Sequence, residues 1–320
     1  MTAAAMQAKA PPSSADLPPE HLVLGHASTE NFPVASRLLP AAVRADLMAL
    51  YGWARLVDEL GDNYAGDRLA ALDEVERQLR VALGESGQGW AGDSFATHAV
   101  VARTAEMVRR RHLASQPLYD LAQANRQDQL VKRYETFADL AGYCRLSANP
   151  VGRMVLGIFG QATPERAGWS DDICTGLQLV EHWQDVAEDA IVGRVYIPQE
   201  DMRRFAVSEH ELTPPRADYV DRRRPRAPGG ASPACRALMA FQAARARGLL
   251  VAGSPLVASL GGQLRFAVAG FVAGGHAALD ALAALDFDIY ADTARPTRRH
   301  FVQHLLTLLA LANRRSGGER

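Results

Sequence analysis

Apolar residues recur along the chain at intervals of three and four positions, from about residue 38 to the C-terminus. That interval is the period of an α-helix with one buried face, whereas the alternation typical of a half-buried strand is scarce. The pattern predicts helices over 43–60, 69–83, 100–112, 117–130, 137–149, 236–253 and 297–315. The chain is therefore expected to be all-α.

One predicted helix, LQLVEHWQDVAED over residues 177–189, separates polar from apolar residues. Its polar stripe follows steps of 3, 4 and 4 and consists of Gln178, Glu181, Asp185 and Asp189. The opposite side carries Leu177, Val180, Trp183 and Val186. Because like charges four residues apart repel by about 0.2–0.5 kcal/mol, this stripe needs a compensating partner, and a divalent cation is the obvious one.

A second stripe lies upstream in YGWARLVDELGD, with steps of 4, 3 and 4. It consists of Tyr51, Arg55, Asp58 and Asp62. One acidic pair at this spacing is no evidence of a site, because a chain with 36 acidic residues among 320 contains several by chance. Two pairs, each beside an apolar stripe and matching polar residues, favour a shared function.

Two such carboxylate pairs suit the departure of a diphosphate. Mg²⁺ takes one or two carboxylates and completes its shell with water and phosphate oxygens, and it neutralises charge on a leaving group. A di-iron bundle is the alternative, but it requires Glu-x-x-His pairs, and none occurs in a suitable place. His182 adjoins Glu181 and points elsewhere, so we expect an interhelical hydrogen-bond partner rather than a ligand.

Composition removes several classes of function. With 35 basic and 36 acidic residues the net charge is −1, so no global positive field attracts nucleic acid. The three cysteines (Cys144, Cys174 and Cys235) form no CxxC pair, which argues against a zinc site or disulfide framework and favours a reducing cytoplasm. Residues 1–25 lack a long apolar run, so we expect a disordered lead-in rather than a signal peptide.

Two further segments stand out. The most apolar window, Phe266–Leu285, is interrupted by His276, Asp280 and three glycines, which favours a buried, close-packed helix over a membrane span. Residues 212–233 contain five prolines and five arginines and are expected to form a mobile surface loop. Its arginines at 222–224 and 226 either contact an anionic phospholipid or the substrate diphosphate, or belong to a solvated linker, which is the simpler interpretation.

The two stripes lie within longer motifs that resemble the squalene/phytoene synthase family. TENFPVASRLLPAAVRADLMALYGWARLVDELGD resembles the first motif of the family, and LQLVEHWQDVAEDAIVGRVYIPQED resembles its second Asp-rich motif with the trailing Arg-x-Tyr-x-Pro. The match runs from about residue 28 to 200 and is weaker beyond. Within the family, YCRLSANPVG and EHWQDVAED are similar to the hopanoid-pathway branch that makes hydroxysqualene.

This resemblance implies a single isoprenoid (terpenoid) synthase domain over 26–315, a helical bundle with a central cavity. It implies that magnesium and diphosphate are bound by Asp58, Asp62, Asp185 and Asp189, with Glu181 as a further metal ligand. Arg55 and Tyr51 match positions that face the diphosphate and the reacting carbons. The flexible segment that covers the site is matched by Thr29, Asn31 and Phe32, and Gln178 is a further substrate-binding candidate.

The chain departs from the family at three positions. Glu181 stands where the family usually has Asn, Gln184 where it often has Arg, and Glu59 where it has Asp. Glu181 keeps an oxygen ligand and adds negative charge, while the loss of Arg at 184 removes a diphosphate contact. Both changes suit an enzyme that only ionises a diphosphate made elsewhere.

Asn149-Pro150 should break or kink a helix, because the residue before a proline avoids the α region. Either the break is simply a helix end, or it borders the cavity and Ser147 or Asn149 positions the water that captures the cation. Arg194 and Tyr196 likewise either close the site after the second motif or anchor a turn.

The expected activity is Mg²⁺-dependent conversion of presqualene diphosphate into hydroxysqualene. The first alternative is condensation of two farnesyl diphosphates to presqualene diphosphate or squalene, and the second is a non-catalytic assembly factor of the same fold. The expected activity implies pathway partners that make presqualene diphosphate and reduce hydroxysqualene. It also implies a cytoplasmic protein, and substrate and product that partition into lipid are compatible with peripheral contact at the inner membrane face.

Overall fold

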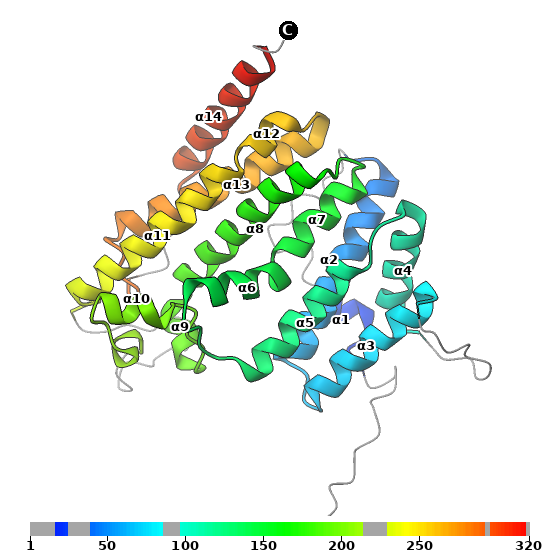
Figure 1. Cartoon of the computed structure of the whole chain (residues 1–320), viewed down its shortest axis with the longest axis horizontal. Helices are drawn as coiled ribbons and strands as arrows, with labels where there is room; N and C mark the ends of the chain where they lie inside the picture. The colour runs from blue at the N-terminus through cyan, green and yellow to red at the C-terminus, as the bar shows by residue number, and fades with distance from the viewer. Residues whose placement is uncertain (1–16, 25–38, 86–96, 214–228, 292–294, 318–320) are drawn as a thin grey trace, which may run out of the picture. The chain divides into compact units, whose positions relative to one another are not determined.

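The computed structural model describes residues 17–24, 39–85, 97–213, 229–291 and 295–317 (Figure 1). These residues form helices and turns, and their only strand-like feature is an isolated bridge between Arg133 and Val195. The all-α prediction is confirmed. The chain divides into two compact units, Met1–Gln129 and Leu130–Arg320, which are described separately. The single domain expected over 26–315 stays a prediction.

The first unit is built around a long buried helix. Its helices are α1 (Glu20–Leu24), α2 (Ala41–Asp62), α3 (Arg68–Leu83), α4 (Ala99–Arg111) and α5 (Gln116–Leu130). The apolar side of α2 is fully buried through Leu47, Trp53, Leu56, Val57 and Leu60. Trp53 Nε1 donates to the carbonyl of Leu118 at 2.9 Å, which ties α2 to α5.

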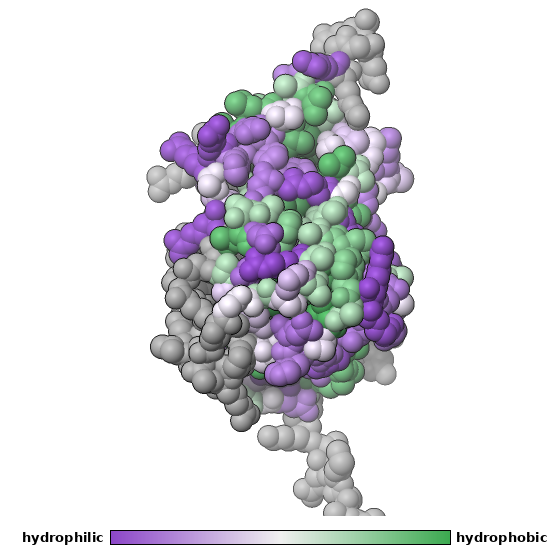
Figure 2. Space-filling model, turned by 90° about the vertical axis from the view of Figure 1, so that its left-hand side faces the viewer, coloured by the Kyte–Doolittle hydropathy of each residue, from purple (hydrophilic) through white to green (hydrophobic). Residues whose placement is uncertain are grey.

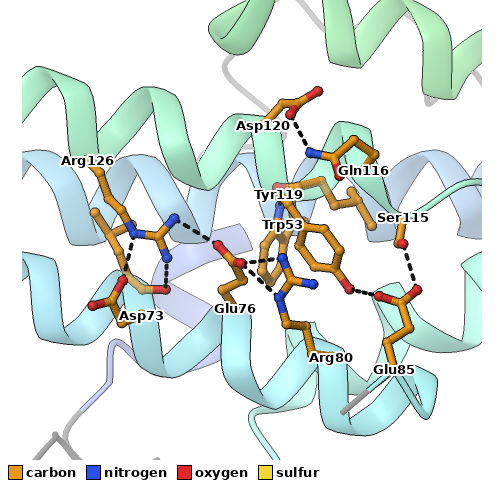
Figure 3. A network of polar contacts seen from close by, with 12 residues as sticks. Trp53, Asp73, Glu76, Arg80, Glu85, Ser115, Gln116, Tyr119, Asp120 and Arg126 are labelled. Carbon is orange, nitrogen blue, oxygen red and sulfur yellow. Dashed lines mark hydrogen bonds and ion pairs between the residues drawn. The ribbon is translucent and has the colours of Figure 1, made fainter. Parts of the chain in front are cut away.

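Buried and half-buried ion pairs hold the other helices of this unit in place. Asp46 of α2 is completely buried and pairs with Arg110 and Arg111 at the end of α4. Figure 3 shows a second network, which joins α3 and α5. In it, Arg126 forms ion pairs with Asp73 and Glu76, and Arg80 forms an ion pair with Glu76. The Arg80 guanidinium also lies over the ring of Tyr119, whose hydroxyl donates to Glu85.

The expected disordered lead-in over residues 1–25 is wrong for its last part. Residues 20–24 form α1, and Leu17 and Val23 are buried. His98 Nε2 lies 2.9 Å from the carbonyl oxygen of Pro18. Burial of these apolar side chains offsets the conformational entropy that this segment loses when it becomes ordered. Its composition alone suggests a polar, proline-rich segment.

The second unit contains the remaining helices. They are α6 (Phe137–Ser147), α7 (Asn149–Ile158), α8 (Pro164–Gln184), α9 (Val186–Ile191), α10 (Gln199–Arg204), the 3₁₀-helix η2 (Glu209–Leu212), α11 (Pro233–Gly253), α12 (Pro255–Ser259), α13 (Gly262–Ala284) and α14 (Arg298–Gly317). α8 is central and lies between α7 and α11 (Figure 1).

Glycines allow α8, α11 and α13 to pack closely. A Cβ on Gly275 of α13 would lie 2.8 Å from a methyl of Leu177, and one on Gly176 of α8 would lie 3.0 Å from a methyl of Leu250. This is the close packing expected of the apolar window around α13. α13 is also the one described helix long and apolar enough to cross a membrane, and half of its most apolar window is buried in the protein.

Two predicted irregularities take definite form. α6 ends at Ser147 and α7 begins at Asn149 with Pro150 in its first turn, so the predicted break is confirmed. The loop predicted over 212–233 has boundaries that are too wide. Leu212 is buried in η2 and Pro233 begins α11, while the arginine run at 222–226 lies outside the described residues.

Candidate active site

The first acidic stripe lies on one uninterrupted helix. α2 runs through Tyr51, Arg55, Asp58 and Asp62, so the spacing read from the sequence does place them on one face. Tyr51 is buried, Arg55 and Asp58 are half-buried, and Asp62 is exposed in the last turn. The stripe therefore passes from the core to solvent along the helix.

A residue of α5 completes this face. Asn125 Nδ2 donates to Asp58 Oδ1 at 3.1 Å and to the Leu121 carbonyl at 3.2 Å. A Cβ on Gly61 would lie only 2.3 Å from Asn125 Oδ1, so glycine at that position permits the approach. Sequence reasoning missed Asn125, although its place on the buried face of a predicted helix, four residues after Leu121, was a usable signal.

The carboxyl of Asp58 is difficult to ionise. Burial raises its pKa to about 6, with help from the charges of Asp62 and Asp128, although the Asn125 hydrogen bond and Arg55 act in the opposite direction. The groups that favour the charged form of Asp58 are thus outweighed by those that oppose it. A hard divalent cation would lower this pKa, and carboxylate oxygens are the donors that Mg²⁺ selects.

The second stripe is on a bent helix rather than the single helix predicted over 177–189. α8 ends at Gln184, Asp185 has φ −108° and ψ 12°, and α9 begins at Val186. Asp is a poor helix former and the neighbouring acids repel one another, so the helix is weakest here. The backbone N–H of Asp185 nevertheless donates a hydrogen bond to the carbonyl of Glu181 (3.2 Å), and that of Asp189 donates to the carbonyl of Asp185 (2.8 Å). These hydrogen bonds keep the acids on successive turns.

A further acid, Glu188, joins this stripe. It shares a side-chain hydrogen bond with Asp185. Partial burial of both carboxyls raises the pKa of Asp185. Burial and the negative charge of Asp185 together raise the pKa of Glu188 to about 7. Glu188 is therefore partly protonated near neutral pH, and a bound cation would displace the proton. Glu188 was not among the predicted site residues because it lies off the i, i+4 spacing.

The apolar side of the same helices borders a small pocket. Its volume is about 190 Å³ with its opening to solvent included. The lining residues are His182, Trp183, Val186, Asp189, Arg194, Val195, Tyr196, Ile197 and Leu212. Three predicted site residues, Asp189, Arg194 and Tyr196, thus meet at one pocket. The Nε1 of Trp183 is buried and has no hydrogen-bond acceptor among the described residues.

Aromatic stacking fixes one wall of the pocket. The rings of His182 and Tyr196 are stacked 3.7 Å apart with an interplanar angle of 11°, and Tyr134 and Tyr143 lie around Tyr196. Burial lowers the pKa of His182 to about 3, so the imidazole is neutral. The interhelical hydrogen bond expected for His182 is wrong: the histidine lies 3.4 Å from Gln178 of its own helix and contacts other elements by stacking.

The candidates at the helix break occupy different environments. Asn149 is buried, and its Oδ1 accepts a hydrogen bond from Thr175 Oγ1 of α8 at 2.9 Å. Ser147 Oγ is buried without a hydrogen-bond partner among the described residues. The predicted covering residues, Thr29, Asn31 and Phe32, lie outside the described residues.

The acids fit a magnesium ion that is bound with its substrate better than a closed metal site. Within the described residues, no group of three or more His, Cys, Asp or Glu side chains is arranged to hold a metal ion alone. Mg²⁺ does not need such a cage, because it is commonly bound by one or two carboxylates with phosphate oxygens and water. Asp58 and Asp62 belong to the first unit, and Glu181, Asp185 and Asp189 to the second.

Comparisons with known proteins agree with these motifs. The chain is 36% identical over 194 residues to a hydroxysqualene synthase of Zymomonas mobilis, covering 59% of this chain and 61% of that protein. It is 34% identical over 198 residues to a 15-cis-phytoene synthase of Synechococcus elongatus, covering 57% and 61%. The alignments thus span about three fifths of these relatives' lengths.

Solved structures share the fold. Squalene synthase HpnC from Alicyclobacillus acidocaldarius matches with a TM-score of 0.70 at 32% identity, over 86% of this chain and 98% of that one. A dehydrosqualene synthase in complex with a ligand matches with a TM-score of 0.72 at 22% identity, over 92% and 95%. The sequence profile described as squalene/phytoene synthase matches residues 26–302. The chain therefore belongs to the squalene/phytoene synthase family.

Proposed function

We propose that this protein is a Mg²⁺-dependent enzyme that converts presqualene diphosphate into hydroxysqualene. The observation that carries the proposal is the set of acidic residues on α2, α8 and α9, whose pKa values are raised at Asp58, Asp185 and Glu188. Burial and neighbouring negative charge oppose the ionisation of these three carboxyls, and a divalent cation bound with a diphosphate would favour it. The similarity to hydroxysqualene synthases supports the particular reaction.

In this proposal the acids hold the leaving group. Asp58, Asp62, Asp185 and Asp189 bind magnesium–diphosphate, with Glu181 as an additional ligand, and Gln178 contacts the substrate. The metal supplies neutralisation of the charge that develops as the carbon–oxygen bond breaks. Arg55 and Arg194 donate to phosphate oxygens, a task for which the guanidinium fork is suited.

The remaining residues protect the carbocation and deliver water. The ring face of Tyr196, and that of Tyr51, attract a cation without reacting with it, and the neutral His182 stacked on Tyr196 adds no repelling charge. Water then attacks the rearranged cation to form the carbon–oxygen bond and loses a proton. Ser147 Oγ, which has no partner among the described residues, is our candidate to orient this water, while Asn149 is held by Thr175.

Condensation of two farnesyl diphosphates is the second candidate. Similarity to phytoene synthases and to a structure titled squalene synthase favours it. Both reactions need the same diphosphate-binding acids, so the acids do not separate them. A non-catalytic assembly factor would have no need of these acids. For either enzyme we propose a cytoplasmic location and pathway partners that supply the diphosphate and use its product.

A product assay tests the proposal. The full chain with Mg²⁺ receives presqualene diphosphate or farnesyl diphosphate, without NADPH, and extracted lipids are identified by mass spectrometry. We expect hydroxysqualene from the first substrate and no product from the second. We expect Asp185→Asn to lower turnover by about 100-fold or more, a typical loss for an electrostatic contact at a leaving group.

The matched control is Glu165→Gln, which removes an exposed acid from the first turn of α8. Consumption of farnesyl diphosphate would move the protein to the condensing reaction. Full activity of Asp185→Asn would contradict the assigned diphosphate site.

A further inference from the structure

The C-terminal helix α14 is basic although the chain as a whole is slightly acidic. Its 20 residues contain no Asp or Glu, while arginines occur at both ends. Arg298 and Arg299 begin the helix and Arg314 lies near its end, and all three are exposed. α14 therefore presents positive charge to its surroundings.

One side of α14 is firmly attached to the second unit. Leu305, Leu309 and Ala312 pack against Val257 of α12 and Ala269 of α13. His304 Nε2 lies 2.6 Å from Asp280 Oδ2, and Arg265 Nη2 donates to Asn313 Oδ1 at 2.6 Å. These contacts occur along most of the helix, so its opposite side has a fixed orientation.

The exposed side of α14 carries large apolar residues. Leu306 is 62% exposed and Val302 40%, and with exposed Ala310 they follow steps of four along the helix. Phe266 of α13, 61% exposed, follows Arg265 and so lies at the end of the hairpin that contains Asn313. Figure 2 shows hydrophobic and hydrophilic residues side by side at the upper end of the protein, where α14 ends.

The charges decide between two ways of covering this face. A symmetric contact between two copies would bring arginines of one sign together, which is unfavourable. The surface of a bilayer that contains anionic lipids offers the complementary charge and attracts arginines that lie close to it. A helix with arginines beside exposed Leu and Val matches the pattern of helices that lie in a membrane interface.

We propose that the exposed face of α14, together with Phe266 of α13, is a docking surface for an anionic phospholipid bilayer. Val302 and Leu306 insert among the acyl chains near the headgroups, and Arg298, Arg299 and Arg314 contact lipid phosphates. The surface is independent of the proposed reaction, because none of these residues belongs to the candidate active site.

Vesicle flotation with the full chain tests the surface. The vesicles contain phosphatidylcholine alone or a mixture of phosphatidylcholine and phosphatidylglycerol, each at low and high salt. We expect binding to the mixed vesicles at low salt and much weaker binding in the other conditions. Leu306→Ser should lower the partition coefficient about tenfold, the scale of one buried leucine. Arg298→Gln with Arg299→Gln should remove most of the salt dependence.

Leu22→Ser is the matched control, because Leu22 of α1 is 59% exposed and carries the same side chain outside α14. Thermal unfolding should be the same for all variants, since the substituted residues are exposed. Equal binding to neutral and anionic vesicles, no binding at all, or equal effects of Leu306→Ser and Leu22→Ser would overturn the proposal. So would sedimentation velocity that shows a dimer dissociated by Leu306→Ser, because the face would then join two copies.

Discussion

At the scale of single residues, ionisation is controlled by neighbours that are distant in the sequence. Asp58 has a pKa of about 6 because burial and two other aspartates oppose its charge, and Asn125, 67 positions later, is the main group that stabilises it. Glu188 has a pKa of about 7 for similar reasons. A proton and a divalent cation therefore compete for these carboxylates near neutral pH.

Replacing Asn125 by Ala should make this competition more severe. The hydrogen bond stabilises the charged carboxylate, so its loss raises the pKa of Asp58 further and lets a proton occupy it to higher pH. We expect the Mg²⁺ concentration for half-maximal turnover to rise several-fold near pH 6 and little near pH 8, about two units above the present pKa.

Titrations of turnover against Mg²⁺ at both pH values give the measurement. Gln116→Ala removes another amide from α5, one that pairs with Asp120, and serves as the control. An equal increase at both pH values would mean that Asn125 supports the fold rather than the ionisation of Asp58.

At the scale of helices, packing depends on where side chains are absent. Gly253 at the end of α11 lies so close to α8 that an added Cβ would be 2.5 Å from the backbone oxygen of Trp169 and 2.6 Å from Ile173 Cγ1. Gly248, in the same helix, has no atom near the corresponding position. The two glycines therefore differ in function although both are helical.

This contrast predicts opposite effects of the same substitution. Gly253→Ala should lower the free energy of unfolding by about 1–3 kcal/mol, because the backbone of α8 has to move. Gly248→Ala should raise it by about 0.5–1 kcal/mol through better helix propensity. Urea denaturation of the two variants provides the comparison, and equal effects would contradict the close contact of α8 and α11.

A charged cluster joins α11, α13 and α14. Arg247 Nη2 donates to Asp280 Oδ1 at 2.7 Å, His304 contacts the other oxygen of Asp280, and His276 stacks on His304. Burial lowers the pKa of His276 to about 4, and the neighbouring Arg247 and His304 lower it as well, against the charge of Asp280. His276 is therefore neutral in the folded protein near pH 7.

The sign of the resulting pH dependence follows from linkage. Between the unfolded pKa of 6.5 and the folded value of about 4, the unfolded chain binds more protons at this residue. Stability is therefore present above pH 6.5 and is lost as the pH falls, by up to about 2 kcal/mol at pH 5. Asp280 contributes below this window: burial opposes its ionisation, but hydrogen bonds from His304 and Arg247 lower its pKa.

His276→Asn should remove this part of the pH dependence. Urea denaturation of the wild type and the variant at pH 7 and at pH 5 measures the difference, which should shrink by about 2 kcal/mol in the variant. Stability curves that fall in parallel for both proteins would show that other groups cause the loss.

At the scale of the whole molecule, the candidate ligands are divided between two compact units. Asp58 and Asp62 precede the division at residue 129, and Asp185 and Asp189 follow it. Neither set alone forms a metal cage within the described residues. The proposed function, in which all four acids bind magnesium–diphosphate, therefore requires residues of both units.

Thermal unfolding with Mg²⁺ and inorganic diphosphate tests this requirement. The two ligands together should raise Tm by about 5 °C when they saturate the site, and either ligand alone should have a smaller effect. Asp58→Asn in the first unit and Asp185→Asn in the second should each abolish the joint effect. Glu165→Gln should retain it. Loss in only one of the two Asp variants would assign the diphosphate to a single unit.

The sequence by itself determined the helices and the faces they carry. Helical periodicity and the i, i+4 spacing are local properties, so α2 with its stripe from Tyr51 to Asp62 was predictable, and so was the break at Asn149-Pro150. The family followed from two long motifs in the right order. The sequence did not predict that residues 17–24 are ordered, because Leu17 and Val23 become buried only in the folded unit.

Which groups adjust the ionisation of these carboxyls depends on contacts between distant parts of the chain. The bond from Asn125 to Asp58, the stacking of His182 on Tyr196 and the pocket beside Trp183 each join residues from separate elements. The bend at Asp185, the raised pKa of Glu188 and the exposed strip on α14 likewise depend on solvent access and neighbouring charge. A linear pattern fixes which way a side chain points on its helix, but the electrostatic environment of that side chain depends on everything packed around it.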